Sequence, residues 1–242
     1  MDDRCPTGIK GFDDLVEGGL PRNRTILVNG SCGTGKTVFV TQFLHNGAVH
    51  HDEKCVLVML EQDADEFKED MMGFNFDLQK LEDEGKLIIV NARLKQKDVN
   101  FMTLCSDTFD ITPNKETVEN IAEVIGEAAA KIGAKRAAID SLSSLMISFD
   151  DESKLRRLIL DLNYKLKKMG LTTLIISDEV AGDVTEAAEK YVVDGVISLR
   201  YLTTGPDAGR SLIIDKMRRT GHSENIHTLK FNKGEGIEIL KE

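Results

Sequence analysis

Short apolar runs alternate with longer amphipathic stretches along most of the chain. The apolar runs have the length and the β-branched content of buried strands, and they cover residues 25–28, 55–60, 87–90, 137–139 and 172–176. Between them, apolar positions recur at helical spacing, over residues 37–50, 65–72, 115–132 and 153–169. Because this alternation is typical of βαβ units, the sequence predicts an α/β fold with a mostly parallel central sheet flanked by helices.

The pattern changes toward the C-terminus. Two β-rich runs, at 193–201 and 210–217, flank a turn-rich connection, and shorter runs follow at 226–231 and 236–240. This spacing predicts that the sheet ends in antiparallel strands. The polar, weakly periodic segment 92–114 is expected to be a surface insertion or a mobile functional loop, and insertions are the commoner case.

Composition narrows the class of protein. With 242 residues, 41% of them apolar, the chain can bury one large core, and we expect residues 1–242 to form a single domain. Lys and Arg number 31 against 41 Asp and Glu, a net charge of −10 that repels nucleic acid and acidic lipid, so neither is an expected partner. No apolar stretch reaches membrane-spanning length, and the N-terminus does not resemble a signal peptide. We therefore expect a cytoplasmic protein.

The four cysteines lie far apart in the sequence, at Cys5, Cys32, Cys55 and Cys105. They form no C-x-x-C pair, and reduced thiols are expected rather than a zinc site.

Residues 30–37 read GSCGTGKT and match the phosphate-loop pattern G-x-x-x-x-G-K-[ST]. They lie between a predicted strand and a predicted helix, as a functional phosphate loop requires. The loop backbone is expected to bind phosphate oxygens through Ser31, Cys32, Gly33, Thr34, Gly35 and Val38. Lys36 is expected to contact the β- and γ-phosphates, and the Thr37 hydroxyl to bind Mg²⁺. The alternative is a glycine turn that binds no ligand.

Two further apolar strands end in a carboxylate. Asp140 follows the run 137–139 and is the candidate second Mg²⁺ ligand; a carboxylate that merely caps the next turn is the alternative. Glu61 follows the run 55–60 and could act as general base for an attacking water. Alternatively, Glu61 is a surface residue at the start of a helix, whose first turn we expect to carry Asp63, Asp65 and Glu66.

Three cations lie at or directly after the end of the strand predicted at 210–217: Lys216, Arg218 and Arg219. A solvated basic turn would explain them. Because nothing in the chain's own phosphate site needs them, we also expect that they could serve the nucleotide of a neighbouring subunit.

With these residues identified, the chain resembles the KaiC family of RecA-like P-loop ATPases nearly from end to end. The resemblance begins with TGIKGFDDL at residues 7–15 and GGLP at 18–21. It continues through the phosphate loop, QFL at 42–44, Leu60-Glu61, FNFDL at 74–78 and FDI at 109–111. The segments IDSL at 139–142 and KMR at 216–218 complete it.

The resemblance implies a RecA-like fold and a homo-oligomeric ring of six subunits with ATP (or ADP) and Mg²⁺ bound at each interface. It implies that Lys36 and Thr37 act within their own subunit, while Lys216 and Arg218 reach the γ-phosphate of the adjacent one. It also implies that Met217, Thr220 and His222 line the base and ribose from that neighbour.

Departures from the family pattern qualify these expectations. Glu61 is followed by Gln62 where the family often has two glutamates, so slow hydrolysis is expected. Lys190 and Tyr191 stand where autophosphorylating members have a Ser-Thr pair, so we expect neither an autokinase nor, in a single domain, a circadian role. Met72 and Gly73 replace polar groups near the base, which weakens the expectation of adenine selectivity.

Three functions remain open from the sequence. The first is a slow Mg²⁺-dependent ATPase whose ring signals to an unknown protein partner. The second is a nucleotide-binding scaffold or regulator with little turnover. The third, a recombinase-like protein on DNA, is opposed by the acidic balance and by the lack of an added DNA-binding domain.

Overall fold

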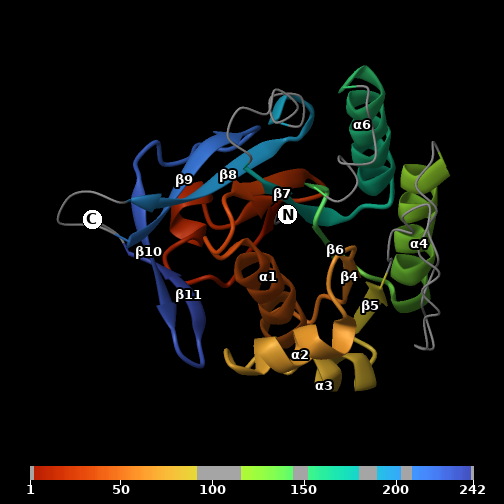
Figure 1. Cartoon of the computed structure of the whole chain (residues 1–242), viewed down its shortest axis with the longest axis horizontal. Coiled ribbons are helices and arrows are strands. Elements are labelled where there is room, and N and C mark those ends of the chain that lie inside the picture. The colour runs from red at the N-terminus through yellow and green to blue at the C-terminus, as the bar shows by residue number, and fades with distance from the viewer. Residues whose placement is uncertain (1–2, 92–115, 144–151, 180–189, 203–208, 241–242) are drawn as a thin grey trace.

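The computed structural model describes residues 3–91, 116–143, 152–179, 190–202 and 209–240. In these residues nine strands form one sheet in the order β11-β10-β9-β8-β3-β7-β6-β4-β5 (Figure 1). The parallel strands are β3 (Thr25–Gly30), β4 (Cys55–Met59), β5 (Leu87–Asn91), β6 (Arg136–Asp140), β7 (Thr172–Asp178) and β8 (Gly195–Leu202). The antiparallel strands are β9 (Gly209–Met217), β10 (His227–Asn232) and β11 (Gly236–Ile239). The predicted mostly parallel sheet with antiparallel C-terminal strands is confirmed.

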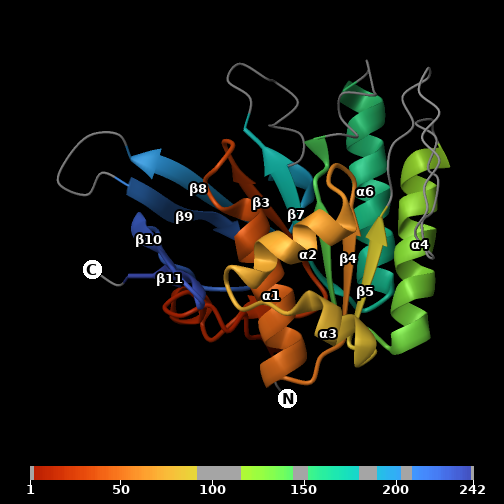
Figure 2. The same ribbon diagram turned by 60° about the horizontal axis from the view of Figure 1, so that its bottom comes forward.

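Helices cover both faces of the sheet (Figures 1 and 2). One face carries α1 (Lys36–His50), α2 (Ala64–Met72) and α3 (Leu78–Asp83), and the other carries α4 (Glu116–Ile132) and α6 (Glu152–Lys168). The predicted helices correspond to α1, α2, α4 and α6. Helix α3 was not predicted, because its six residues are too short to establish a helical period.

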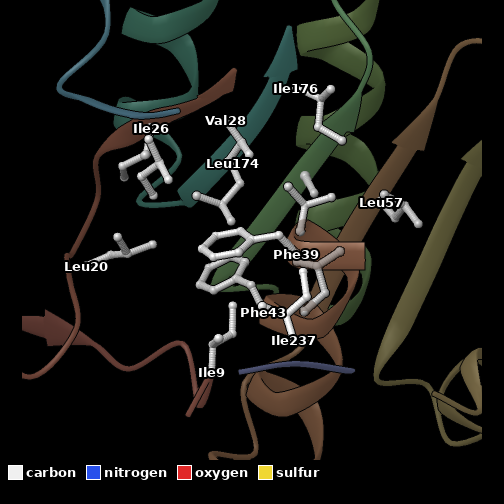
Figure 3. Packing of buried hydrophobic residues seen from close by; sticks show 14 of the residues in the cluster. Ile9, Leu20, Ile26, Val28, Phe39, Phe43, Leu57, Leu174, Ile176 and Ile237 are labelled. Atoms are coloured by element: carbon white, nitrogen blue, oxygen red, sulfur yellow. The ribbon is translucent and has the colours of Figure 1, made fainter. Parts of the chain in front are cut away.

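The parallel strands are apolar on both sides because each side meets a helical layer. On β3, Ile26 and Val28 face the α1 side, while Leu27 joins the cluster on the α4 and α6 side. Figure 3 shows the first of these clusters, with the rings of Phe39 and Phe43 from α1 lying against the strands.

The N-terminal segment packs beside α1 and the C-terminal strands. It contains the two-residue strands β1 (Arg4–Cys5) and β2 (Leu20–Pro21) and the 3₁₀ helix η1 (Asp13–Val16), none of which the apolar pattern predicted. The amide of Ile239 donates to the Lys10 carbonyl, which ties this segment to β11. The segment at 92–114, expected to be an insertion or a functional loop, lies outside the described residues. Among the described helices, none is long and apolar enough to cross a bilayer.

Candidate functional site

The phosphate loop connects the carboxyl end of β3 to the first turn of α1. Gly33 and Gly35 adopt positive φ angles of 78° and 108°, which side-chain-bearing residues rarely adopt. A Cβ atom on Gly35 would also lie 2.5 Å from the Phe231 ring. Glycine is therefore required at both positions for steric reasons. The strand–loop–helix context predicted for the loop is confirmed.

Lys36 lies in the loop with its amine almost fully enclosed, since the residue is 7% exposed. Its Nζ donates to the carbonyl oxygens of Gly30 and Ser31, at 2.8 and 2.9 Å, and forms a 2.8 Å ion pair with Asp178 Oδ1. Asp178 ends β7 and pairs with Gly30 across the sheet. Asp178 was not among the predicted site residues. It stands one residue beyond the apolar run 172–176, whereas Asp140 directly follows 137–139.

Thr37 and Asp140 are brought together at the same sheet edge. The Thr37 hydroxyl donates to Asp140 Oδ2 at 2.9 Å. Burial raises the pKa of the Asp140 carboxyl to about 6, and the carboxylates of Glu61 and Asp178 add to the rise, whereas the Thr37 hydroxyl opposes it. The site therefore holds one hydroxyl and one carboxylate where the sequence predicted Mg²⁺ ligands.

Glu61 lies beside Asp140 because β4 and β6 are neighbours, with Met59 paired to Asp140. The buried Ser141 hydroxyl donates to Glu61 Oε1 at 2.7 Å, so the carboxylate is held at the site. Glu61 lies outside α2. Asp63 caps this helix by accepting from the Asp65 amide rather than lying in its first turn, a small correction to the sequence prediction.

A cavity of about 840 Å³ joins these groups. Its lining includes the predicted site residues Cys32, Gly33, Gly35, Lys36, Thr37, Val38, Glu61 and Asp140. Ser31 and Thr34 do not line it; the Thr34 side chain is turned into the loop, where its hydroxyl donates to the Ser31 carbonyl at 2.8 Å.

Aromatic side chains form another wall of this cavity. Phe74 and Phe231 line it with ring centroids 6.0 Å apart, and the Arg210 guanidinium lies 4.6 Å from the Phe231 centroid. Met72 and Gly73, which the sequence reasoning placed near a base, are exposed and absent from the lining. Phe74 lines the cavity instead, and its position in the FNFDL segment was the signal available in the sequence.

The C-terminal cations lie away from the phosphate loop of their own chain. Met217 pairs with Gly195, which pairs with Ile26 at the start of β3, whereas the loop begins after Gly30 at the opposite edge. Ile26 and Gly30 are four residues apart on β3, which corresponds to about 13 Å along the strand. The structure therefore does not bring Lys216 and Arg218 to the site around Lys36.

Both cations are instead held by the segment that precedes β8. Lys216 Nζ donates to the carbonyls of Lys190, Tyr191 and Val193, at 3.0, 3.4 and 2.7 Å. Burial and the charge of Arg218 lower the pKa of Lys216. The Arg218 amide donates to the Asp194 carbonyl at 2.8 Å, while its side chain is 53% exposed.

Met217, Thr220 and His222 lie at the end of β9 and directly after it. Met217 is buried in the core, so any contact it makes with a neighbour would involve its main chain. Thr220 accepts a hydrogen bond from Arg4, and His222 Nδ1 lies 3.0 Å from the Ser223 carbonyl.

Cys32 offers a chemical probe of the cavity. Among the described cysteines it is exposed, whereas Cys5 and Cys55 are buried, which raises their thiol pKa values to about 11 and about 12. We expect N-ethylmaleimide to modify Cys32 before these two, and saturating Mg-ADP to slow that modification at least about tenfold by covering the thiol. Mass spectrometry of the Cys32 peptide measures the rate. An equal rate with and without ADP would contradict the placement of a nucleotide on this loop.

Comparisons with known proteins agree with this architecture. A family model described as "ATPase: KaiC" matches residues 5–242. The circadian clock oscillator protein KaiC of Thermostichus vulcanus is 35% identical over 237 residues, which cover 97% of this chain and 44% of the relative. KaiC of Synechococcus elongatus is 36% identical over 219 residues, covering 89% of this chain and 40% of the relative. The chain thus spans less than half the length of these curated relatives.

A solved structure extends the match to the whole fold. The crystal structure of a KaiC-like protein from Pyrococcus horikoshii superposes with a TM-score of 0.81 at 32% identity, covering 98% of this chain and 99% of that one. Together with the match of the family over residues 5–242, this shows that the chain belongs to the KaiC family of ATPases and has its RecA-like fold.

Proposed function

We propose that the chain is a slowly turning-over, Mg²⁺-dependent ATPase, acting as one KaiC-type domain over residues 1–242 in the cytoplasm. The observation that carries the proposal is the convergence of Lys36, Thr37, Asp140 and Glu61 on one cavity at the carboxyl edge of the sheet. In this assignment the loop backbone from residue 31 to 38 and the Lys36 amine bind the phosphates of ATP or ADP.

The residues present fit Mg²⁺. The Thr37 hydroxyl and the Asp140 carboxylate are hard oxygen ligands, and their oxygens lie 2.9 Å apart. Mg²⁺ sites in nucleotide enzymes use one or two such protein groups together with phosphate oxygens and water. A bound Mg²⁺ would neutralise charge that develops on the β- and γ-phosphates.

Glu61 is assigned to the attacking water. Its carboxylate stands next to Asp140 on the neighbouring strand and is held by Ser141, so it can orient a water and accept its proton. Gln62 also lines the cavity but carries no charge, and a single carboxylate at this position supports slow hydrolysis.

The site is completed by a neighbouring copy of the chain. Lys216 and Arg218 lie at the opposite edge of the sheet from their own phosphate loop, and the exposed Arg218 side chain is available to another subunit. We assign both to the γ-phosphate of the neighbour, with Met217, Thr220 and His222 toward its ribose and base, in a homohexameric ring. In this arrangement hydrolysis depends on assembly of the ring. We assign to the ring an unidentified protein partner that responds to its nucleotide state.

A nucleotide-binding scaffold with little turnover is the second candidate. The observation that favours it is Gln62, a neutral residue beside Glu61 where the family resemblance expects a second carboxylate. If the chain binds ATP and assembles but does not release phosphate over repeated turnovers, the scaffold is favoured.

Replacing Glu61 with glutamine tests the ATPase. The amide retains an oxygen that can accept from Ser141 but cannot take a proton, so we expect steady-state phosphate release to fall about a hundredfold or more while ATP binding remains. Phosphate release and the Kd for ATP are measured side by side. Glu66→Gln, at an exposed glutamate of α2, is the matched control. Equal turnover by wild type, Glu61→Gln and Lys36→Ala would rule out hydrolysis at this site.

A further inference from the structure

Side chains from the C-terminal half of the sheet converge on the backbone of the phosphate loop. Tyr201, near the end of β8, donates its hydroxyl to the Gly33 carbonyl oxygen at 2.7 Å. Arg210, near the start of β9, donates Nε to the same oxygen at 3.1 Å. The two residues are direct cross-strand partners, so one pair of strands delivers both donors.

The Arg210 guanidinium is held in place by two aromatic rings. It lies 5.0 Å from the centroid of the Tyr201 ring and 4.6 Å from that of Phe231. Contact with the rings of Tyr201 and Phe231 restricts the guanidinium and fixes the direction of its N–H groups. Arg210 also lines the nucleotide cavity, so its charge faces the region where phosphates are expected.

Two donors on one carbonyl oxygen fix the orientation of the Gly33–Thr34 peptide. A carbonyl oxygen has two lone pairs, and here both have donors. In a trans peptide the C=O and the N–H point in opposite directions, so holding the Gly33 oxygen toward β8 and β9 directs the Thr34 N–H to the other side. The Thr34 N–H contacts the Ser31 carbonyl at 3.4 Å, a long hydrogen bond that a phosphate oxygen can replace.

The orientation of this peptide matters for an anion. Phosphate loops bind through inward-facing N–H groups, and a carbonyl turned inward would set a partial negative charge against the phosphate oxygens. Gly33 has a positive φ and no side chain to restrict its backbone, so the Gly33–Thr34 peptide can rotate unless its carbonyl is held.

We propose that Tyr201 and Arg210 are positioning residues that hold the Gly33–Thr34 peptide ready for the β-phosphate of the nucleotide. The inference rests on the proposed nucleotide-binding function. The bonds themselves are exposed, and Tyr201 is 44% exposed, so they contribute little to the stability of the fold. Their expected effect is on the orientation of the Gly33–Thr34 peptide in the loop.

Tyr201→Phe is the discriminating variant, because it removes the hydroxyl while keeping the ring and every charge. We expect its Kd for ADP to rise about fivefold, the effect of one lost hydrogen bond, with an unchanged melting temperature. Adenosine, measured as a competitor of a fluorescent ADP, carries no phosphate and is expected to keep its affinity. Tyr164→Phe is the matched control at an exposed tyrosine of α6.

Arg210→Lys is the second variant, which retains the positive charge but not the planar guanidinium. It is expected to weaken ADP more than adenosine, and its effect should not add fully to that of Tyr201→Phe because both act on one peptide. Unchanged ADP affinity in Tyr201→Phe would overturn the inference, as would equal losses for ADP and adenosine, which would assign these residues to the base. If the wild type binds neither compound, the proposed function itself fails.

Discussion

Replacing Lys36 with alanine is expected to raise the Kd for ATP by more than about a hundredfold and to abolish hydrolysis. The amine is the one group in the loop that carries a full positive charge, and it lies among Gly30, Ser31 and Asp178. Without it, Asp178 and Asp140 leave the cavity with uncompensated negative charge, which repels the triphosphate in addition to the direct loss of contact.

Calorimetry with ATP and with ADP measures the affinity, and a melting curve checks the fold. Lys80→Ala, at an exposed lysine that pairs with Glu84 at 4.0 Å, is the matched control and should bind as wild type does. Asp178→Asn separates the contact made by the amine from the repulsion by uncompensated carboxylates. This variant keeps the Lys36 amine but removes the negative charge that the amine neutralises. An ATP affinity for Lys36→Ala within about threefold of wild type would exclude a phosphate role for this loop.

Much of this site could be predicted from the sequence, because parallel strands end at a common edge. Asp140 and Glu61 each follow an apolar run, and β6 and β4 are adjacent, so the two carboxylates lie together as expected. The loop residues follow from a local motif whose backbone geometry needs no information from elsewhere in the chain.

The features that were missed depend on strand order. Asp178 has a local signal similar to that of Asp140, one residue further from its apolar run, but its partner Lys36 becomes evident only because β7 lies next to β3. Likewise, the apolar pattern predicted β8 and β9 as strands but not that Tyr201 and Arg210 would pair beside Gly33. The bonds of Tyr201 and Arg210 to Gly33 join residues 168 and 177 positions apart, and no periodicity in the sequence encodes such contacts.

Strand order also determines which phosphate the C-terminal cations can reach. In the sequence Lys216 and Arg218 are simply basic residues at the end of a strand. The register of β9 on β8 and of β8 on β3 places them at the edge away from their own phosphate loop. A role at a phosphate therefore requires the phosphate of another chain, which an experiment with two defective subunits can test.

Subunits of Lys36→Ala and of Arg218→Ala are each expected to have less than about 1% of wild-type ATPase activity alone, because one lacks the loop amine and the other the arginine. Co-expressed in equal amounts with different tags and purified through both, they are expected to recover activity. If each site combines the loop of one subunit with the arginine of the next, random mixing gives about a quarter of the sites both intact parts.

Arg218 is the better residue for this test than Lys216. Its side chain is half exposed, lies 3.9 Å from Asp194 and makes one long bond, 3.5 Å, to the Tyr191 carbonyl, so truncation should change the fold little. Lys216, in contrast, donates to three backbone carbonyls, and its removal would disturb the turn before β8. Arg200→Ala, at an exposed arginine of β8, serves as the matched control and should remain active without mixing.

Recovery on mixing can arise only if complementary parts of a site come from different chains, since neither subunit contains a complete set. Doubly tagged assemblies that stay inactive would therefore contradict the shared site even though the subunits associate. A protein that stays monomeric with and without Mg-ATP would contradict it as well, because Lys216 and Arg218 would then have no second phosphate loop to reach. Activity that returns together with assembly would make the ring, rather than the single chain, the unit that hydrolyses ATP.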